Sequence, residues 1–86
     1  MNISVELTLT PLQDSYEEAV ILFIKRLRAS GLIVKENPLS TQVYGDYETV
    51  MEVLHKEIRM AFDSIDHGLL YMKIVKSDRS GYEPDF

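Results

Sequence analysis

Residues 2–10, NISVELTLT, alternate strictly between polar and apolar side chains. Successive side chains of a β-strand point to opposite faces, so this alternation predicts a strand with one buried face. The apolar side chains expected in the core are those of Ile3, Val5, Leu7 and Leu9. The polar side chains, expected on the other face of the sheet, are those of Ser4, Glu6, Thr8 and Thr10.

A helix is predicted directly after this strand, which Pro11 should end. Ser15 and Glu18 have the spacing of a capping box, in which both side chains satisfy free N–H groups at a helix start. Apolar side chains then recur on one helical face, at Tyr16, Ala19, Val20, Phe23 and Leu27. Gly31 supplies the left-handed residue that commonly ends a helix.

The second half of the chain predicts a hairpin, a second helix and a last strand. Two β-prone runs, residues 32–36 and 39–44, are joined by Asn37-Pro38, which places Pro38 at the first position of the second strand. Gly45 should end that strand, and Asp46 should cap an amphipathic helix that ends near residues 67–68. Residues 69–76 form the last predicted strand.

The predicted order β-α-β-β-α-β is that of the ferredoxin-like α+β fold. It implies a four-stranded antiparallel sheet with both helices on one face, leaving the other face open. The 86 residues suffice for one domain, expected over residues 1–78, followed by a polar tail over residues 79–86. The open face is expected to carry, beside the polar side of the first strand, some of Ser40, Gln42, Tyr44, Tyr71, Lys73 and Val75.

Composition argues against several classes of partner. Fourteen acidic residues against nine basic ones give a net charge of −5, the wrong sign for a nucleic-acid-binding domain. No stretch approaches the roughly 20 apolar residues of a membrane span. The N-terminal segment lacks the basic region and the apolar region that are typical of a signal peptide, so the cytoplasm is the expected location.

Catalytic and metal-binding motifs are also missing from the sequence. The chain has no cysteine, and His55 and His67 are too far apart, without a third ligand, to predict a metal site. It contains neither a G-x-S-x-G motif nor a glycine-rich phosphate loop. We therefore expect a protein that binds a ligand or a copy of itself without catalysis, and without a cofactor.

Two features are candidates for ligand contact, and each has a simpler reading. Glu6 lies in the middle of a strand, where a covered carboxylate would need a partner, but it could equally be solvated on an open face. The hydroxyls of Ser40 and Thr41 could bind an amine or ring nitrogen of a small heterocycle. They could also reflect β-propensity and turn formation alone.

Residues 7–12, LTLTPL, and residues 38–46, PLSTQVYGD, each lead into a predicted helix. Together they resemble the small thiamine-binding protein family, the YkoF-like group. In that family a strand ends in a Y-P-L/M segment, and a later strand of the form P-M-S/G-T-x-I/V-x-G stops at the second helix. The resemblance covers nearly the whole chain.

This resemblance implies a ferredoxin-like domain that binds thiamine or its hydroxymethylpyrimidine part without chemistry, as a homodimer or homotetramer. By motif, Ser40, Thr41 and Gly45 carry over as ligand-binding residues, and Glu6 matches an acidic position of the first strand. The side chains that could cover the bound ring are those of Tyr44, Tyr71 and Met72. No cluster typical of diphosphate binding is present, so the unphosphorylated vitamin is the expected ligand.

A competing interpretation is an assembly or regulatory module similar to amino-acid-sensing ACT domains, in which any ligand lies between subunits. A purely structural oligomer is a third. The three differ in ligand response, because a thiamine binder should respond to the pyrimidine, an ACT-like sensor to amino acids, and a structural oligomer to neither.

Overall fold

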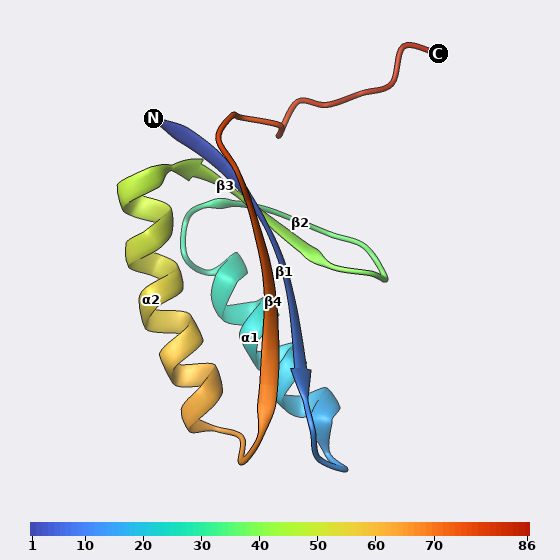
Figure 1. The fold of residues 1–86 in the computed structure, drawn as a ribbon, viewed down its shortest axis with the longest axis vertical. Coiled ribbons are helices and arrows are strands. Elements are labelled where there is room, and N and C mark those ends of the chain that lie inside the picture. Colours follow the sequence, from blue (N-terminus) through green and yellow to red (C-terminus); the bar gives the residue numbers. More distant parts are fainter.

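The computed structural model describes all 86 residues. It contains four strands and two helices in the predicted order (Figure 1). The elements are β1 (Asn2–Pro11), α1 (Tyr16–Arg28), β2 (Ile33–Glu36), β3 (Thr41–Asp46), α2 (Tyr47–Asp63) and β4 (Gly68–Val75).

The four strands form one sheet in the order β2-β3-β1-β4, in which every neighbouring pair is antiparallel. β1 is therefore central, and Val5 pairs with Val43 of β3 on one side and Ile74 of β4 on the other. The two helices connect strands of this sheet, α1 joining β1 to β2 and α2 joining β3 to β4 (Figure 1). The predicted ferredoxin-like α+β fold is confirmed.

The core lies between the helices and one face of the sheet. All four apolar side chains of β1 are at most 8% exposed, as the alternation predicted. They pack against side chains from α1, α2 and β3, namely Phe23, Leu27, Val43, Val50, Leu54 and Ala61. Because β1 supplies four of these ten core residues, its polar side chains are fixed on the opposite face, which we call the open face.

The start of α1 differs from the prediction. Ser15 is the N-cap residue, but its side chain makes no capping hydrogen bond, so the expected capping box with Glu18 is not formed. β1 ends at Pro11, as predicted, and Pro11 is itself the last paired residue, opposite Gly68 of β4. A proline is tolerated there because it stands at the end of the ladder. Gly31 has a φ of 88°, the left-handed conformation expected after α1.

The hairpin between β2 and β3 is also displaced from its predicted position. Pro38 lies in the turn and not in a strand, because the Asn37 side chain holds the turn. Its Oδ1 accepts hydrogen bonds from the backbone N–H groups of Leu39, at 2.8 Å, and Ser40, at 3.0 Å. β3 therefore begins at Thr41.

The prediction that Gly45 ends β3 was wrong, since Gly45 still pairs with Ile3 and Asp46 with Asn2. Asp46 is nevertheless the N-cap of α2, and its side chain accepts from the N–H of Thr49 at 3.4 Å. α2 ends at Asp63, four residues before the predicted His67, and β4 occupies Gly68–Val75. These shifts leave the faces of the strands as predicted.

Ion pairs tie the helices to each other and to the sheet. Arg26 of α1 binds Glu57 of α2, with Nε 2.5 Å from the carboxylate, and Arg28 binds Glu36 of β2. The bond to Arg28 holds the pKa of the Glu36 carboxyl below its usual range.

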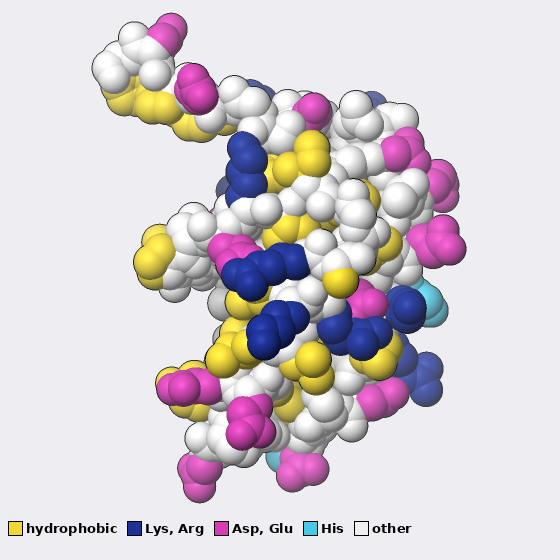
Figure 2. All heavy atoms as spheres, turned by 180° about the vertical axis from the view of Figure 1, so that it is seen from behind, with side chains coloured by type: hydrophobic (Ala, Val, Ile, Leu, Met, Phe, Trp, Pro, Cys, Tyr) yellow, Lys and Arg dark blue, Asp and Glu magenta, His cyan; other side chains and the backbone are white.

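Seen from behind, Lys and Arg side chains gather in a band across the middle of the molecule, with Asp and Glu around it (Figure 2).

Neither helix is both long enough and apolar enough to cross a membrane.

Candidate functional site

The open face carries a row of polar side chains across all four strands. In this row Lys35 pairs with Gln42, Gln42 with Glu6, and Glu6 with Lys73. The next row consists of Ile33, Tyr44, Ser4 and Val75. Side chains directly opposite each other in antiparallel strands lie about 5 Å apart at Cβ, so the sheet brings one carboxylate, one amide and two ammonium groups together.

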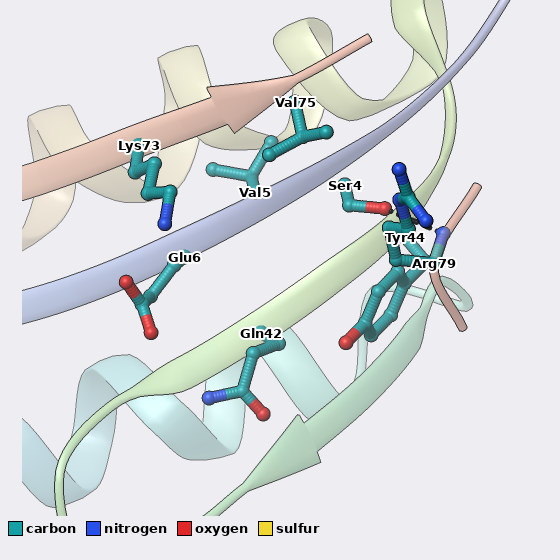
Figure 3. Close-up of a pocket in the computed structure, with 8 residues that line it drawn as sticks. All are labelled: Ser4, Val5, Glu6, Gln42, Tyr44, Lys73, Val75 and Arg79. Atoms are coloured by element: carbon teal, nitrogen blue, oxygen red, sulfur yellow. Dashed lines mark hydrogen bonds between the residues drawn. The ribbon is translucent and has the colours of Figure 1, made fainter. Parts of the chain in front are cut away.

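A hollow lies over these two rows, with a volume of about 120 Å³. We call it the open-face hollow. It is lined by Ser4, Val5, Glu6, Gln42, Tyr44, Lys73, Val75 and Arg79. Figure 3 shows Glu6 and Lys73 at one end and Tyr44, Ser4 and Arg79 at the other. The hollow therefore offers a carboxylate and a guanidinium separated along its length.

The segment after β4 completes this hollow, because Ser4 holds it against the sheet. The buried Ser4 hydroxyl donates to the carbonyl oxygen of Ser77 at 2.7 Å and accepts from the N–H of Arg79 at 2.8 Å. The Lys35 ammonium donates to the carbonyl oxygen of Ser80. Residues 77–80 thus cross the end of the open face and bring Arg79 over it.

Asp78 stabilises the turn on either side of Arg79. Its carboxylate accepts from the hydroxyl of Ser80 at 2.6 Å and from the N–H of Ser80 at 2.9 Å. The side-chain bond and then the backbone bond from Ser80 lower the pKa of the Asp78 carboxyl, against an opposing effect of burial, and the charge of Lys35 adds a small further lowering. The carboxylate therefore stays charged over the neutral range, and the turn keeps its shape there.

A second cavity, of about 140 Å³, lies where β1 and β3 part. We call it the turn-side crevice. The pairing of these strands ends at Leu7 and Thr41, and beyond it the Thr8 hydroxyl donates to the carbonyl oxygen of Leu39 at 3.3 Å. The crevice is lined by Leu7, Thr8, Leu9, Val20, Phe23, Ile24, Asn37, Pro38, Leu39, Ser40 and Thr41. It combines an apolar floor with hydroxyl groups from three residues.

Ser40 links the two cavities. Its hydroxyl donates to Glu6 Oε2 at 3.0 Å and accepts from Gln42 Nε2 at 2.6 Å. Ser40 lines the crevice, whereas Glu6 and Gln42 line the open-face hollow. Glu6 is thus a partly buried carboxylate with one hydrogen-bond donor already in place.

The structure divides the seven residues predicted from sequence between the two faces of the sheet. Glu6, Tyr44 and Tyr71 lie on the open face, and the Ser40 hydroxyl reaches Glu6 there. The other three share the register of core residues on the helix face, at Thr41, Gly45 and Met72. Tyr71 lines neither of the two cavities.

The three residues on the helix face have different surroundings. Thr41 is buried and lines the crevice. Gly45 packs closely, because a Cβ atom there would lie 3.1 Å from Leu32 and 3.2 Å from Val50. Met72 lies opposite Leu7 on the edge strand and lines neither cavity.

Arg79 is the lining residue that sequence reasoning missed, because it falls in the segment expected to be a tail outside the domain. The sequence indicates the position of Arg79 only indirectly. Ser4, a small hydroxyl residue on the central strand, can bind the backbone of a segment that crosses over it. Gln42 and Lys73 were expected on the open face but not as part of a site. The strand register alone places them beside Glu6.

The arrangement can bind a polar heterocycle but offers no set of metal ligands. No group of three or more His, Cys, Asp and Glu side chains lies close enough to hold a metal ion. A carboxylate, an amide and hydroxyls next to an apolar crevice are the groups that bind amines and ring nitrogens.

Several solved structures share this fold. A protein of Thermotoga maritima, whose suggested role is in thiamine biosynthesis or salvage, superposes with a TM-score of 0.81 at 18% identity, over 90% of this chain and 85% of that one. A hypothetical protein of Methanocaldococcus jannascii gives 0.77 at 19% identity, over 90% and 81% of the two chains. A domain of unknown function from Bacillus cereus gives 0.76 at 15% identity, over 99% and 85%.

At such low identity, these likenesses support the fold alone. A comparison with curated proteins gave no match. The family model described as thiamine-binding protein, however, matches residues 5–84, which include the whole turn-side crevice, Arg79 and every residue lining the open-face hollow except Ser4. The chain belongs to the thiamine-binding protein family.

Proposed function

We propose that this protein binds thiamine, or its hydroxymethylpyrimidine part, without catalysis and as a homo-oligomer. The binding site is the region around the hydrogen bond between Ser40 and Glu6, with the turn-side crevice on one side and the open-face hollow on the other. Family membership supports the ligand class, and this site supplies the matching chemistry.

The Ser40–Glu6 hydrogen bond is the observation that carries the proposal. It joins two residues that are 34 positions apart and that the family resemblance names independently. An aminopyrimidine presents an amine donor and ring-nitrogen acceptors. The Glu6 carboxylate would accept from the amine, while hydroxyls at the mouth of the crevice would donate to a ring nitrogen.

A binding role is supported by the lack of catalytic partners around Glu6. His55 lies within α2 and His67 follows it, and neither lines the crevice or the hollow. Ser40 donates a hydrogen bond to a carboxylate that also faces Lys73, so acceptor and donor groups are already in position for a ligand.

The size of the two cavities supports assembly. They measure about 120 and 140 Å³, whereas sites for small molecules usually measure about 300–1,000 Å³. The open face also exposes apolar side chains, including half of each of Ile33, Leu69 and Tyr71. A second copy covering this face would bury these side chains and enclose the ligand.

Replacing Glu6 with glutamine tests the site. The change keeps the shape of the side chain but removes its charge, so affinity for thiamine and hydroxymethylpyrimidine should fall about tenfold, near the lower end for hydrogen bonds to charged groups. Isothermal titration calorimetry measures this. Glu52→Gln, an exposed glutamate on α2, is the matched control and should leave affinity unchanged.

Full affinity in Glu6→Gln would refute the placement of the site. Failure of the wild-type protein to bind either compound at millimolar concentration would refute the proposed ligand. Thermal stabilisation by a free amino acid instead would favour the ACT-like alternative.

Oligomer formation is tested separately by sedimentation velocity. We expect the wild-type protein to sediment as a dimer or tetramer at micromolar concentration. Leu69→Lys places a charge on the exposed apolar part of the open face and should shift the protein toward the monomer. Leu12→Lys, which changes an exposed leucine in the β1–α1 loop, serves as control. A wild-type monomer would contradict the proposed assembly.

A further inference from the structure

We infer that the open-face hollow accepts an anionic group, so that the preferred ligand is a phosphate monoester of the heterocycle rather than the free vitamin. This rests on the proposed function and concerns the end of the same site that Arg79 and Lys73 line. It also differs from the expectation drawn from sequence, which found no phosphate-binding cluster.

Arg79 is the first observation that carries the inference. Of the four arginines, Arg26, Arg28 and Arg59 form ion pairs with carboxylates, whereas Arg79 forms none. Its guanidinium lies at the edge of the hollow beside Ser4 and Tyr44 (Figure 3). A planar fork of N–H donors without a carboxylate partner is suited to bind phosphate oxygens.

The position of Arg79 is built into the fold. Its backbone N–H is bound by the hydroxyl of Ser4, a side chain that is only 7% exposed and belongs to the central strand. Asp78 and Ser80 hold the turn on either side through two further hydrogen bonds. Because the backbone of Arg79 is fixed in this way, its side chain starts from a set position at the hollow and loses less conformational freedom on binding than one on a loose tail.

Lys73 adds a second positive charge to the hollow. It stands opposite Glu6 in the register, yet its ammonium forms no ion pair within 4.0 Å. The lining thus contains two cations and one carboxylate, although the whole chain carries a net charge of −5. This local excess favours a ligand with a negative group over a purely cationic one.

The two ends of the hollow fit the two ends of such a ligand. The Glu6 end would accept the amine of the pyrimidine, and the Arg79 end would receive the phosphate. Free thiamine has a positive charge and no anionic group, so it would leave the guanidinium of Arg79 unused. The site therefore discriminates by charge as well as by ring chemistry.

Calorimetry with thiamine and thiamine monophosphate tests this inference. The wild-type protein should bind the monophosphate at least about tenfold more tightly than thiamine, because one hydrogen bond between charged groups contributes about that factor in affinity. Arg79→Gln should bring the ratio of the two dissociation constants close to one, and Lys73→Gln should reduce it partly. Inorganic phosphate should compete with the monophosphate more strongly than with thiamine.

Two variants control for loss of positive charge elsewhere. Arg59→Gln removes an exposed arginine of α2, and Lys25→Gln removes an exposed lysine of α1; neither residue lines the hollow. Both should keep the wild-type ratio. Equal affinity of the wild-type protein for both compounds, or an unchanged ratio in Arg79→Gln, would overturn the inference while the proposed function stands. Binding of neither compound would overturn both.

Discussion

Leu27→Ala is expected to lower the free energy of unfolding by about 3 kcal/mol, the middle of the range for a buried leucine cut back to alanine. Leu27 is fully buried, at 0% exposure, among the core side chains between α1 and the sheet. In a domain of this size, such a loss should lower the midpoint of thermal unfolding by about 15 °C. Urea denaturation and differential scanning calorimetry measure the two quantities.

Leu22→Ala is the matched control, because it makes the same substitution in the same helix at a side chain that is 52% exposed. Its effect should stay below about 1 kcal/mol, since exposed positions lack the cavity cost. Similar losses in both variants would show that α1 does not pack on the sheet through Leu27.

The second large effect is expected at the ion pair between the helices. Glu57→Leu should lower the free energy of unfolding by about 2 kcal/mol, because it leaves Arg26 without the carboxylate that binds it. The expected loss is smaller than for a fully buried pair, since the Arg26 side chain is 32% exposed and can reach water. Urea denaturation measures the change.

Replacing both partners separates the charge from the packing. Arg26→Met with Glu57→Leu should recover most of the loss, because two apolar side chains leave no unpaired charge at the helix contact. Asp63→Asn breaks the exposed pair between Arg59 and Asp63 and should change stability by less than about 0.5 kcal/mol. A double variant as unstable as Glu57→Leu alone would contradict this account.

The fold was predictable because the sequence of β1 alone shows which face of the strand is buried. A strict alternation over nine residues leaves one choice of buried face, and the pairing of β1 with β3 and β4 then fixes the faces of Gln42, Tyr44, Tyr71 and Lys73. Element ends were harder to predict, because they depend on single hydrogen bonds. The Asn37 side chain, for example, moves the start of β3 to Thr41.

The candidate site was only partly predictable. Glu6 and Ser40 were identified separately, and their hydrogen bond required the three-dimensional turn that brings residue 40 to β1. Thr41, Gly45 and Met72 all lie on the helix face because of the period of two, and of these only Thr41 lines a cavity, the turn-side crevice. Arg79 depends on the contact of a chain end with Ser4, which no local pattern encodes.

The central place of β1 in the sheet also determines when its strand pairing can be completed during folding. β1 is the first strand of the sheet along the sequence, yet Ser4 pairs with Val75 of β4, the last strand. Until β4 has been synthesised, one long edge of an apolar strand stays without hydrogen-bond partners, and such edges invite pairing with other chains. The sheet is therefore completed only by a contact between strands far apart in the sequence, and a partly folded chain is most exposed to wrong pairing at that edge of β1.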